Sequence, residues 1–455
     1  MLHKPECTPG APGSRTTRRQ PSRGLLALLY FCAALALSLV LALALHNDST
    51  YHTGSWDDYS EALVFGRMLQ MQQDQSAPGG FMGVYTEDWG GEQNRYLYRD
   101  NTPVDPAQYH SYTHQSGLQG WALGAANKVF SVFVPDGTAR ESRLYLLNSV
   151  LFYMAALTVG WSLGRRFGWL TGLGWCAALA AAPWLQTGMK DLYWCLWLWL
   201  LPPLAGIALC AGTAGAGEAA GTPRWGYLLV FLACLLRCLC GFEFVSAYLI
   251  LCEAPLVAAW AAPGLGAAGR RRWLGRMAGA GVAGVGGVAA ALCVWLVQGR
   301  LYFGGWGQSL QNMLGAAGSR MSMSDDTVRA GVTVPGVLYK YIVADATVVL
   351  RAGRWQIALW PLLLATLAAL AASALLLAAL HRTALLRGLA PAAAVWGLAF
   401  LAPVSWMVLS KAHADIHTQL MPMLWQFAFV PGCCALWALL LQTLVRAFLP
   451  AAAKQ

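Results

Sequence analysis

Long apolar segments recur along the chain, and polar segments separate them. A transmembrane helix needs about 20 consecutive apolar residues, whereas a barrel strand alternates apolar and polar positions, which these segments do not. The pattern therefore predicts an all-α polytopic membrane protein with about ten transmembrane helices. The predicted helices cover residues 25–45, 143–163, 169–187, 192–211, 226–241, 245–262, 277–298, 355–380, 389–409 and 421–447.

Basic residues mark one side of the predicted bundle. The short turns "GRRFG" (164–168) and "GRRRWLGR" (269–276) are the clearest examples, and basic residues also precede the first span. Because positively charged loops stay in the cytoplasm, this distribution predicts a cytoplasmic N-terminus, and an even number of spans returns the C-terminus to the same side. These loops and their contact with anionic membrane lipids explain the net charge of +10, so no nucleic-acid partner is predicted.

The spans divide the chain into tails, membrane segments and two large external loops. The first apolar segment is longer than the core of a signal peptide, which has about 7–15 residues, so we expect an uncleaved anchor after a disordered basic tail. A segment of mixed charge in the second loop, 320–331, is expected to act as a lid. The predicted divisions are 1–24 (tail), 25–45 (first helix), 46–142 (external loop), 143–298 (helices 2 to 7), 299–354 (second external loop), 355–447 (helices 8 to 10) and 448–455 (cytoplasmic tail).

The first external loop, 46–142, is rich in aromatic residues and too long for a simple connection. Within it, residues 57–71 have the spacing of an amphipathic helix that begins with the acid pair Asp57 and Asp58. An acid at a helix N-terminus stabilises the helix dipole, so the pair is explained either as a cap or as a functional group. A second helix is predicted over 115–131, with its apolar face along the membrane surface.

The stretch "SWDDYSEALVFGRMLQ" (55–70) resembles part of the first external loop of the GT-C membrane glycosyltransferases, in the branch of the aminoarabinose transferases and protein O-mannosyltransferases. That branch has an acid pair, then tyrosine and alanine, and Met-Leu at the end of the helix. Here Glu61 replaces the tyrosine, and the matching residues are Asp57, Asp58, Ala62, Met68 and Leu69. A Pro-Pro-Leu motif of that branch is replaced by "YTHQSGLQGW" (112–121), in which Tyr112 and His114 are candidate substrate contacts.

This resemblance implies an inverting transfer of a sugar from a polyprenyl-phosphate donor to an envelope glycan, lipid or protein acceptor. Either Asp57 or Asp58 is then the general base that accepts a proton from the attacking hydroxyl or amine. The transition state is oxocarbenium-like, by analogy with glycoside hydrolysis, and cations are needed at the phosphate leaving group. The acid pair is expected at the external membrane surface because the reactive carbon of the donor lies there too.

Two cations near the external ends of spans are candidate phosphate contacts, and each has a simpler explanation. Lys190 in "GMKDLYW" (188–194) either binds phosphate or belongs to the aromatic belt of the membrane surface. Arg237 either binds phosphate, which would justify a charge inside a span, or pairs with Glu243. Glu243 is itself a candidate substrate contact.

The segment "SKAHADIHTQ" (410–419) holds the last cluster, which consists of Lys411, His413, Asp415 and His417. Sugar or phosphate contact, a plain polar turn and a divalent metal site all stay open for it. On a helix only His413 and His417 share a face, so the H-x-D-x-H spacing is a weak indication of metal. Glu87 and Asp88 in "YTEDWGG" form a further acid pair that either contacts substrate or makes a turn.

No cofactor is predicted, because the sequence has no Walker-type glycine loop, no HExxH and no strand-borne GxGxxG. Two other functions stay open. An O-antigen polymerase or ligase would carry its main loop later in the chain, and a transporter or flippase would show inverted repeats and polar groups at mid-membrane, where Glu253 is the one acid. The large external loops contain no cysteine for disulfides and one weak sequon at Asn47, which favours a bacterial inner membrane with a periplasmic site.

Overall fold

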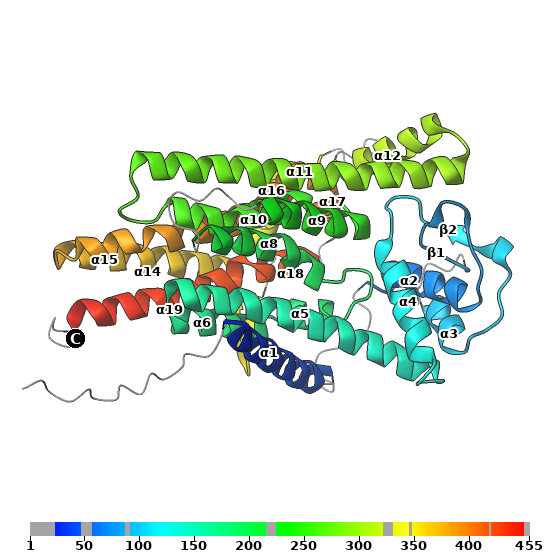
Figure 1. Cartoon of the computed structure of the whole chain (residues 1–455), viewed down its shortest axis with the longest axis horizontal. Helices are drawn as coiled ribbons and strands as arrows, with labels where there is room; N and C mark the ends of the chain where they lie inside the picture. Colours follow the sequence, from blue (N-terminus) through cyan, green and yellow to red (C-terminus); the bar gives the residue numbers. More distant parts are fainter. Residues whose placement is uncertain are drawn as a thin grey trace, which may run out of the picture.

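The computed structural model describes residues 23–46, 57–86, 92–214, 224–321, 331–344, 348–417 and 420–449, which fold almost entirely into helices (Figure 1). The β-structure of these residues consists of two short antiparallel sheets of two strands each. One pairs β1 (Gly83–Val84) with β2 (His110–Ser111), and the other pairs β3 (Val348–Ala352) with β4 (Trp355–Ala358). The predicted helical class is therefore confirmed.

A bundle of apolar helices forms the larger part of the molecule (Figure 1). Its helices are α1 (Arg23–His46), α5 (Gly137–Phe167), α8 (Trp197–Ala214), α9 (Arg224–Cys240), α10 (Val245–Trp260), α11 (Ala267–Phe303), α14 (Leu359–Ala379), α15 (Thr383–Gly388) and α16 (Ala390–Leu409), together with the broken helices described below. Five segments of the described chain are long and apolar enough to cross a membrane, namely Gly137–Phe167, Ala267–Phe303, Leu359–Ala379, Thr383–Leu409 and Pro422–Phe448. These five candidate spans are the features of an integral membrane protein.

Two of the predicted spans are broken helices rather than continuous ones. The span predicted over 169–187 divides into α6 (Trp169–Ala180) and α7 (Pro183–Gly188), because Pro183 has no N–H with which to continue α6. The span predicted over 421–447 divides into α18 (Leu420–Phe427) and α19 (Phe429–Phe448) at Ala428, whose φ of −142° is not helical. Sequence periodicity does not reveal the second break, because apolar residues continue through it.

The two breaks lie together and are joined by side-chain and strand contacts. The Oε1 atom of Gln426 in α18 accepts hydrogen bonds of 3.0 Å from the N–H groups of Trp184 and Leu185 at the start of α7. The Arg351 N–H of β3 donates to the Ala181 carbonyl at 2.8 Å, in the gap between α6 and α7. The span predicted over 355–380 therefore starts with the strand β4, and its helix, α14, begins only after the hairpin.

Small residues let the bundle helices approach each other closely, as is common in membrane helix packing. A Cβ atom at Gly206 of α8 would lie 2.1 Å from the Cys252 carbonyl oxygen of α10. One at Gly287 of α11 would lie 2.4 Å from the Phe231 carbonyl oxygen of α9. Since these neighbours are backbone atoms, larger residues at either glycine would separate the helices.

The described residues between α1 and α5, 57–86 and 92–136, form a small helical domain at one end of the bundle (Figure 1). Its elements are α2 (Asp58–Gln72), η1 (Pro78–Gly80), β1, α3 (Glu92–Arg99), η2 (Pro106–Gln108), β2 and α4 (Leu118–Ser131). Helix α2 is the buried centre, and at Gly66 a Cβ atom would lie 2.1 Å from the Gly83 carbonyl oxygen of β1. The helix predicted over 57–71 is thus confirmed within one residue at each end.

Helix α4 buries polar residues and exposes apolar ones, which is the reverse of a helix in a soluble protein. Its buried side includes the polar residues Gln119 and Asn127, whereas Trp121 and Val129 are 40% and 60% exposed. The glycines on its buried side bring it against α2, since a Cβ atom at Gly124 would collide with Met71. The helix predicted over 115–131 is confirmed from Leu118 onward, and its apolar face points outward as predicted.

The segment predicted to be the second external loop folds back over the same end of the bundle as α2 (Figure 1). Its described elements are α12 (Trp306–Met321), α13 (Val334–Tyr339) and the π-helical turn η4 (Lys340–Ala344), and α17 (Lys411–Ile416) packs against α12. Most of the predicted lid, residues 322–330, lies outside the described residues. Arg320, at the start of the predicted lid, belongs to the last turn of α12.

Candidate active site

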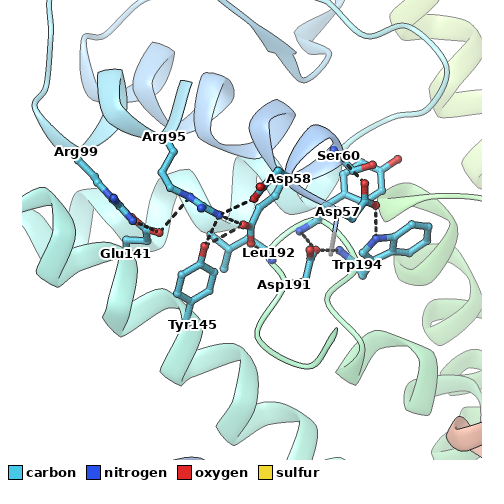
Figure 2. A network of polar contacts seen from close by, with 12 residues as sticks. Asp57, Asp58, Ser60, Arg95, Arg99, Glu141, Tyr145, Asp191, Leu192 and Trp194 are labelled. Carbon is cyan, nitrogen blue, oxygen red and sulfur yellow. Dashed lines mark hydrogen bonds and ion pairs between the residues drawn. The ribbon is translucent and has the colours of Figure 1, made fainter. Parts of the chain in front are cut away.

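Asp57 and Asp58 are adjacent in sequence but contact different parts of the molecule (Figure 2). Asp57 is the N-cap of α2, and its Oδ1 accepts a hydrogen bond of 3.3 Å from the Ser60 N–H. Its Oδ2 accepts one of 2.6 Å from the indole Nε1 of Trp194, in the loop between α7 and α8. The Oδ1 atom of Asp58 instead lies 3.4 Å from the Nη2 of Arg95 in α3. The predicted capping role is therefore correct for Asp57.

Arg95 is the centre of a charged cluster on the Asp58 side (Figure 2). Its Nη2 lies 2.5 Å from the Glu61 Oε2, and its Nε lies 3.4 Å from the Glu141 Oε1 of α5. The Tyr145 hydroxyl, also from α5, donates to the Glu61 Oε2 at 2.9 Å. Arg99 pairs with Glu141 as well. The cluster joins α2, α3 and α5, and its carboxylates are compensated by guanidinium groups.

Glu61 extends this cluster to the loop that carries Trp194. Its Oε1 accepts a hydrogen bond of 2.8 Å from the Leu192 N–H. Glu61 is the residue that departs from the GT-C pattern, and sequence analysis assigned it no role. Its partners come from distant positions in the chain, and the substitution of an acid for tyrosine was the one available signal.

Asp191 belongs to the same loop and holds its backbone through hydrogen bonds. Its Oδ1 accepts hydrogen bonds of 2.8 Å from the N–H groups of both Tyr193 and Trp194, and Asn148 of α5 donates to its carbonyl at 2.8 Å. Burial is the main cause that raises the pKa of Asp191 well above its ordinary value, and the charges of Glu61 and Asp57 raise it further. The Asp191 carboxylate thus fixes the backbone of the loop at Tyr193 and Trp194, and the Trp194 indole contacts Asp57.

Glu243 and Arg320 form an ion pair on the other side of Asp57. The Arg320 Nη2 of α12 lies 3.0 Å from the Oε1 of Glu243, which lies in the turn between α9 and α10. Burial opposes the charge of Glu243, but Arg320 and then Arg237 outweigh it, so the pKa of Glu243 is lowered. Arg320 had no assigned role in the sequence, where it opened the predicted lid.

Tyr112 and His114 lie close to this pair. Trp295 of α11 and Asn312 of α12 both donate hydrogen bonds of 2.9 Å to the Thr113 carbonyl and so hold their segment against the bundle. Burial raises the pKa of Tyr112 to about 12, although the charge of Arg320 lowers it. Burial and then Arg320 lower the pKa of His114, which favours its neutral form.

Asp57 lies near the group formed by Glu243, Arg320 and Tyr112 rather than near the Arg95 cluster. Burial is the largest influence on the pKa of Asp57 and raises it. Hydrogen bonds from Ser60 and Trp194 lower the pKa, the negative charge of Glu243 raises it, and the net shift is upward. The result is a carboxylate with increased basicity, next to Trp194 and within electrostatic reach of Glu243.

His413 of α17 and His417, the residue after that helix, belong to the group that contains Glu243 and Arg320, but Asp415 does not. The rings of His413 and His417 lie 4.3 Å apart, and the buried Nδ1 of His413 has no hydrogen-bond partner in the described chain. Burial, followed by His417, lowers the pKa of His413 to about 3, although the charge of Glu243 opposes this. The Asp415 Oδ1 turns away to the Lys340 Nζ at 3.2 Å.

A metal site at His413, Asp415 and His417 therefore has no support in the structure. The described ranges contain no group of three His, Cys, Asp or Glu side chains arranged to hold a metal ion. The physical reason is helical: α17 continues through Ile416, and positions two apart on a helix point in different directions. The alternative that only the two histidines share a face is the correct one.

The remaining predicted contacts have mixed positions. Arg237 is 2% exposed, and its Nη1 and Nη2 donate to the carbonyls of Gly241 and Glu243 at 2.9 and 3.1 Å, so it supports the turn that carries Glu243. Lys190 precedes Asp191 in the loop before α8, and Lys411 is the first residue of α17; both are partly buried. Glu87 and Asp88 lie outside the described residues.

Comparison of the chain with protein-family models, with curated proteins and with solved structures gives no match. The geometry around Asp57 therefore carries the functional argument.

Proposed function

We propose that this chain is a membrane glycosyltransferase of the GT-C type, which transfers a sugar with inversion from a polyprenyl-phosphate donor to an envelope glycan, lipid or protein. The single observation that carries the proposal is the position of Asp57. It is a partly buried carboxylate where the helical domain meets the bundle, with Trp194 on one oxygen. A general base needs a pKa closer to the working pH than that of a free carboxyl group, and burial moves Asp57 in that direction.

The proposal assigns the base to Asp57 rather than Asp58. Burial raises the pKa of Asp58 as well, but Arg95 opposes that shift and forms an ion pair with the Asp58 Oδ1. The carboxylate of Asp57 makes no ion pair with the cations of the described chain. It removes the proton from the acceptor hydroxyl or amine as the acceptor attacks the anomeric carbon, and the bond from that carbon to the donor phosphate breaks.

Arg320 takes the role of stabilising the phosphate leaving group. It lies in the group that contains Tyr112, Tyr193 and Glu243, and its charge acts on all three. Arg237 instead holds the Glu243 turn through two backbone carbonyls. The phosphate role first considered for Arg237 and Lys190 thus moves to Arg320 in the proposal.

The same proposal places the chain in a bacterial inner membrane, with about ten spans, cytoplasmic termini and a periplasmic site. The outward apolar face of α4 supports it, because such a helix is stable when that face meets lipid at the membrane surface. Reporter fusions at Ala77 and Ala267 are expected to lie on opposite sides of the membrane. Both on one side would contradict this topology.

The function is tested by comparing cells that produce the native chain with cells that produce Asp57→Asn at the same level. Mass spectrometry of envelope lipids, glycans and proteins is expected to show one species whose mass differs by a sugar residue. The purified chain is then expected to release polyprenyl phosphate from a synthetic donor carrying that sugar, with an inverted anomeric centre in the product. Identical envelopes and no donor consumption would refute the proposal.

A further inference from the structure

An apolar cavity of about 520 Å³ lies in the bundle at the end away from Asp57. Its walls come from the last turns of α5, the start of α6, and parts of α8, α10, α16 and α19. Figure 1 shows that α5 starts beside the helical domain and runs away from it along the bundle. The cavity therefore belongs to a region that the proposed reaction does not use.

A series of aromatic contacts runs from the cavity wall toward Asp57. Phe427 lines it and contacts Trp199, with ring centroids 5.4 Å apart. Trp199 in turn contacts Trp194, the hydrogen-bond donor to Asp57, at 6.1 Å. These ring contacts lie between the cavity and the candidate active site.

Two arginines lie at the rim. Arg165 and Arg166, in the last turn of α5, line the cavity and are exposed. Among the described residues, no carboxylate forms an ion pair with either of them. Arg165 packs over the Trp161 ring at 5.9 Å, and Trp161 also lines the cavity. A pair of uncompensated guanidinium groups thus borders an apolar space between membrane helices.

We propose that this cavity binds one acyl chain of an anionic phospholipid, whose phosphate is held by Arg165 and Arg166. The volume is within the range of about 300–1,000 Å³ that is usual for small-molecule sites, and an apolar lining favours a hydrocarbon chain. Guanidinium groups bind phosphate oxygens in a bidentate manner. An anionic headgroup neutralises the two charges, whereas a zwitterionic headgroup brings a further cation to the rim.

The headgroup is tested with the full-length chain in a neutral detergent. Native mass spectrometry measures the binding of phosphatidylglycerol and of phosphatidylcholine with identical acyl chains. We expect one tightly bound phosphatidylglycerol, with binding at least tenfold weaker in the double variant Arg165→Gln/Arg166→Gln. The matched control Arg270→Gln/Arg271→Gln removes two exposed arginines of another turn and is expected to bind like the native chain.

The acyl chain is tested by filling the cavity. Ala399→Phe adds a ring to the wall and is expected to abolish binding of both lipids, while gel filtration shows the native elution volume. Inorganic phosphate is expected not to displace the lipid. Equal phosphatidylglycerol binding by the native chain and by Arg165→Gln/Arg166→Gln would overturn the proposal, as would displacement by inorganic phosphate or a lipid-free dimer that covers this face. If Ala399→Phe does not fold, the arginine variants decide the outcome alone.

Discussion

The two sides of the α2 N-terminus differ in the partners that they give to a carboxylate. On the Asp58 side, Glu61 and Glu141 are paired with Arg95 and Arg99, and a tyrosine hydroxyl and a backbone N–H satisfy Glu61 further. On the Asp57 side, the carboxylate has a helix N-terminus and an indole as partners. Compensated charges hold elements together, whereas an uncompensated carboxylate is free to accept a proton.

Removal of the negative charge of Asp57 is expected to have the largest effect on activity. Asn caps helices as well as Asp does, so Asp57→Asn is expected to insert and fold normally. Loss of the base is expected to lower turnover by about 10²–10⁴. Sugar transfer by the purified variant, measured with the donor identified above, checks this. Turnover close to that of the native chain would make Asp57 a cap and nothing more.

On the other side, removal of Arg95 is expected to affect stability strongly. Arg95→Met leaves Glu61 and Glu141 buried without this partner, and breaking a buried pair in this way costs about 3–5 kcal/mol. Thermal unfolding in a single detergent measures the loss. The control is Lys128→Met, whose ion pair with Asp74 is exposed and is worth about 0–1 kcal/mol. Equal losses in the two variants would remove the distinction between the two sides.

Trp194→Phe tests the role of Asp57 through its pKa. The indole hydrogen bond favours the ionised carboxylate and lowers its pKa, so its loss is expected to raise the pKa of Asp57. A general base works in its ionised form, and activity therefore rises with pH through that pKa. The acidic limb of the pH profile of turnover is expected to move to higher pH, with little change on the alkaline side. An unmoved limb would mean that Asp57 is not the group that titrates.

The smallest effect is expected for Asp58→Asn. The ion pair is long, at 3.4 Å, and Arg95 keeps its two glutamate partners. A loss of about 0–1 kcal/mol of stability and nearly native turnover are expected. Transfer assays on Asp57→Asn and Asp58→Asn, prepared in parallel, test the assignment directly. A large loss of turnover in Asp58→Asn alone would exchange the roles of the two acids.

The sequence predicted helix α2 and its cap because both depend on neighbours within one or two turns. Apolar periodicity also located most bundle helices, and Pro183 accounts for the break before α7. The break at Ala428 and the strand β4 depend on contacts between distant segments, such as Gln426 with α7, which no local pattern encodes.

The candidate site was predictable only in part, for the same reason. Asp57, Tyr112, Glu243 and His413 belong to the group that the structure brings together. Glu61 and Arg320 were missed, because their partners Leu192 and Glu243 lie far away along the chain. Asp415 was grouped with its sequence neighbours, but its partner is Lys340.

The close packing of α4 against α2 has a consequence for the depth of Asp57. A Cβ atom at Gly120 would lie 3.1 Å from the Arg67 Cγ, and one at Gly124 would collide with Met71, so α4 packs closely against α2. In the proposed orientation, α4 lies at the membrane surface with its outward apolar side in contact with lipid. The depth of α4 in the membrane surface, rather than the length of the flanking connections, then sets the distance between the Asp57 carboxylate and the hydrocarbon core.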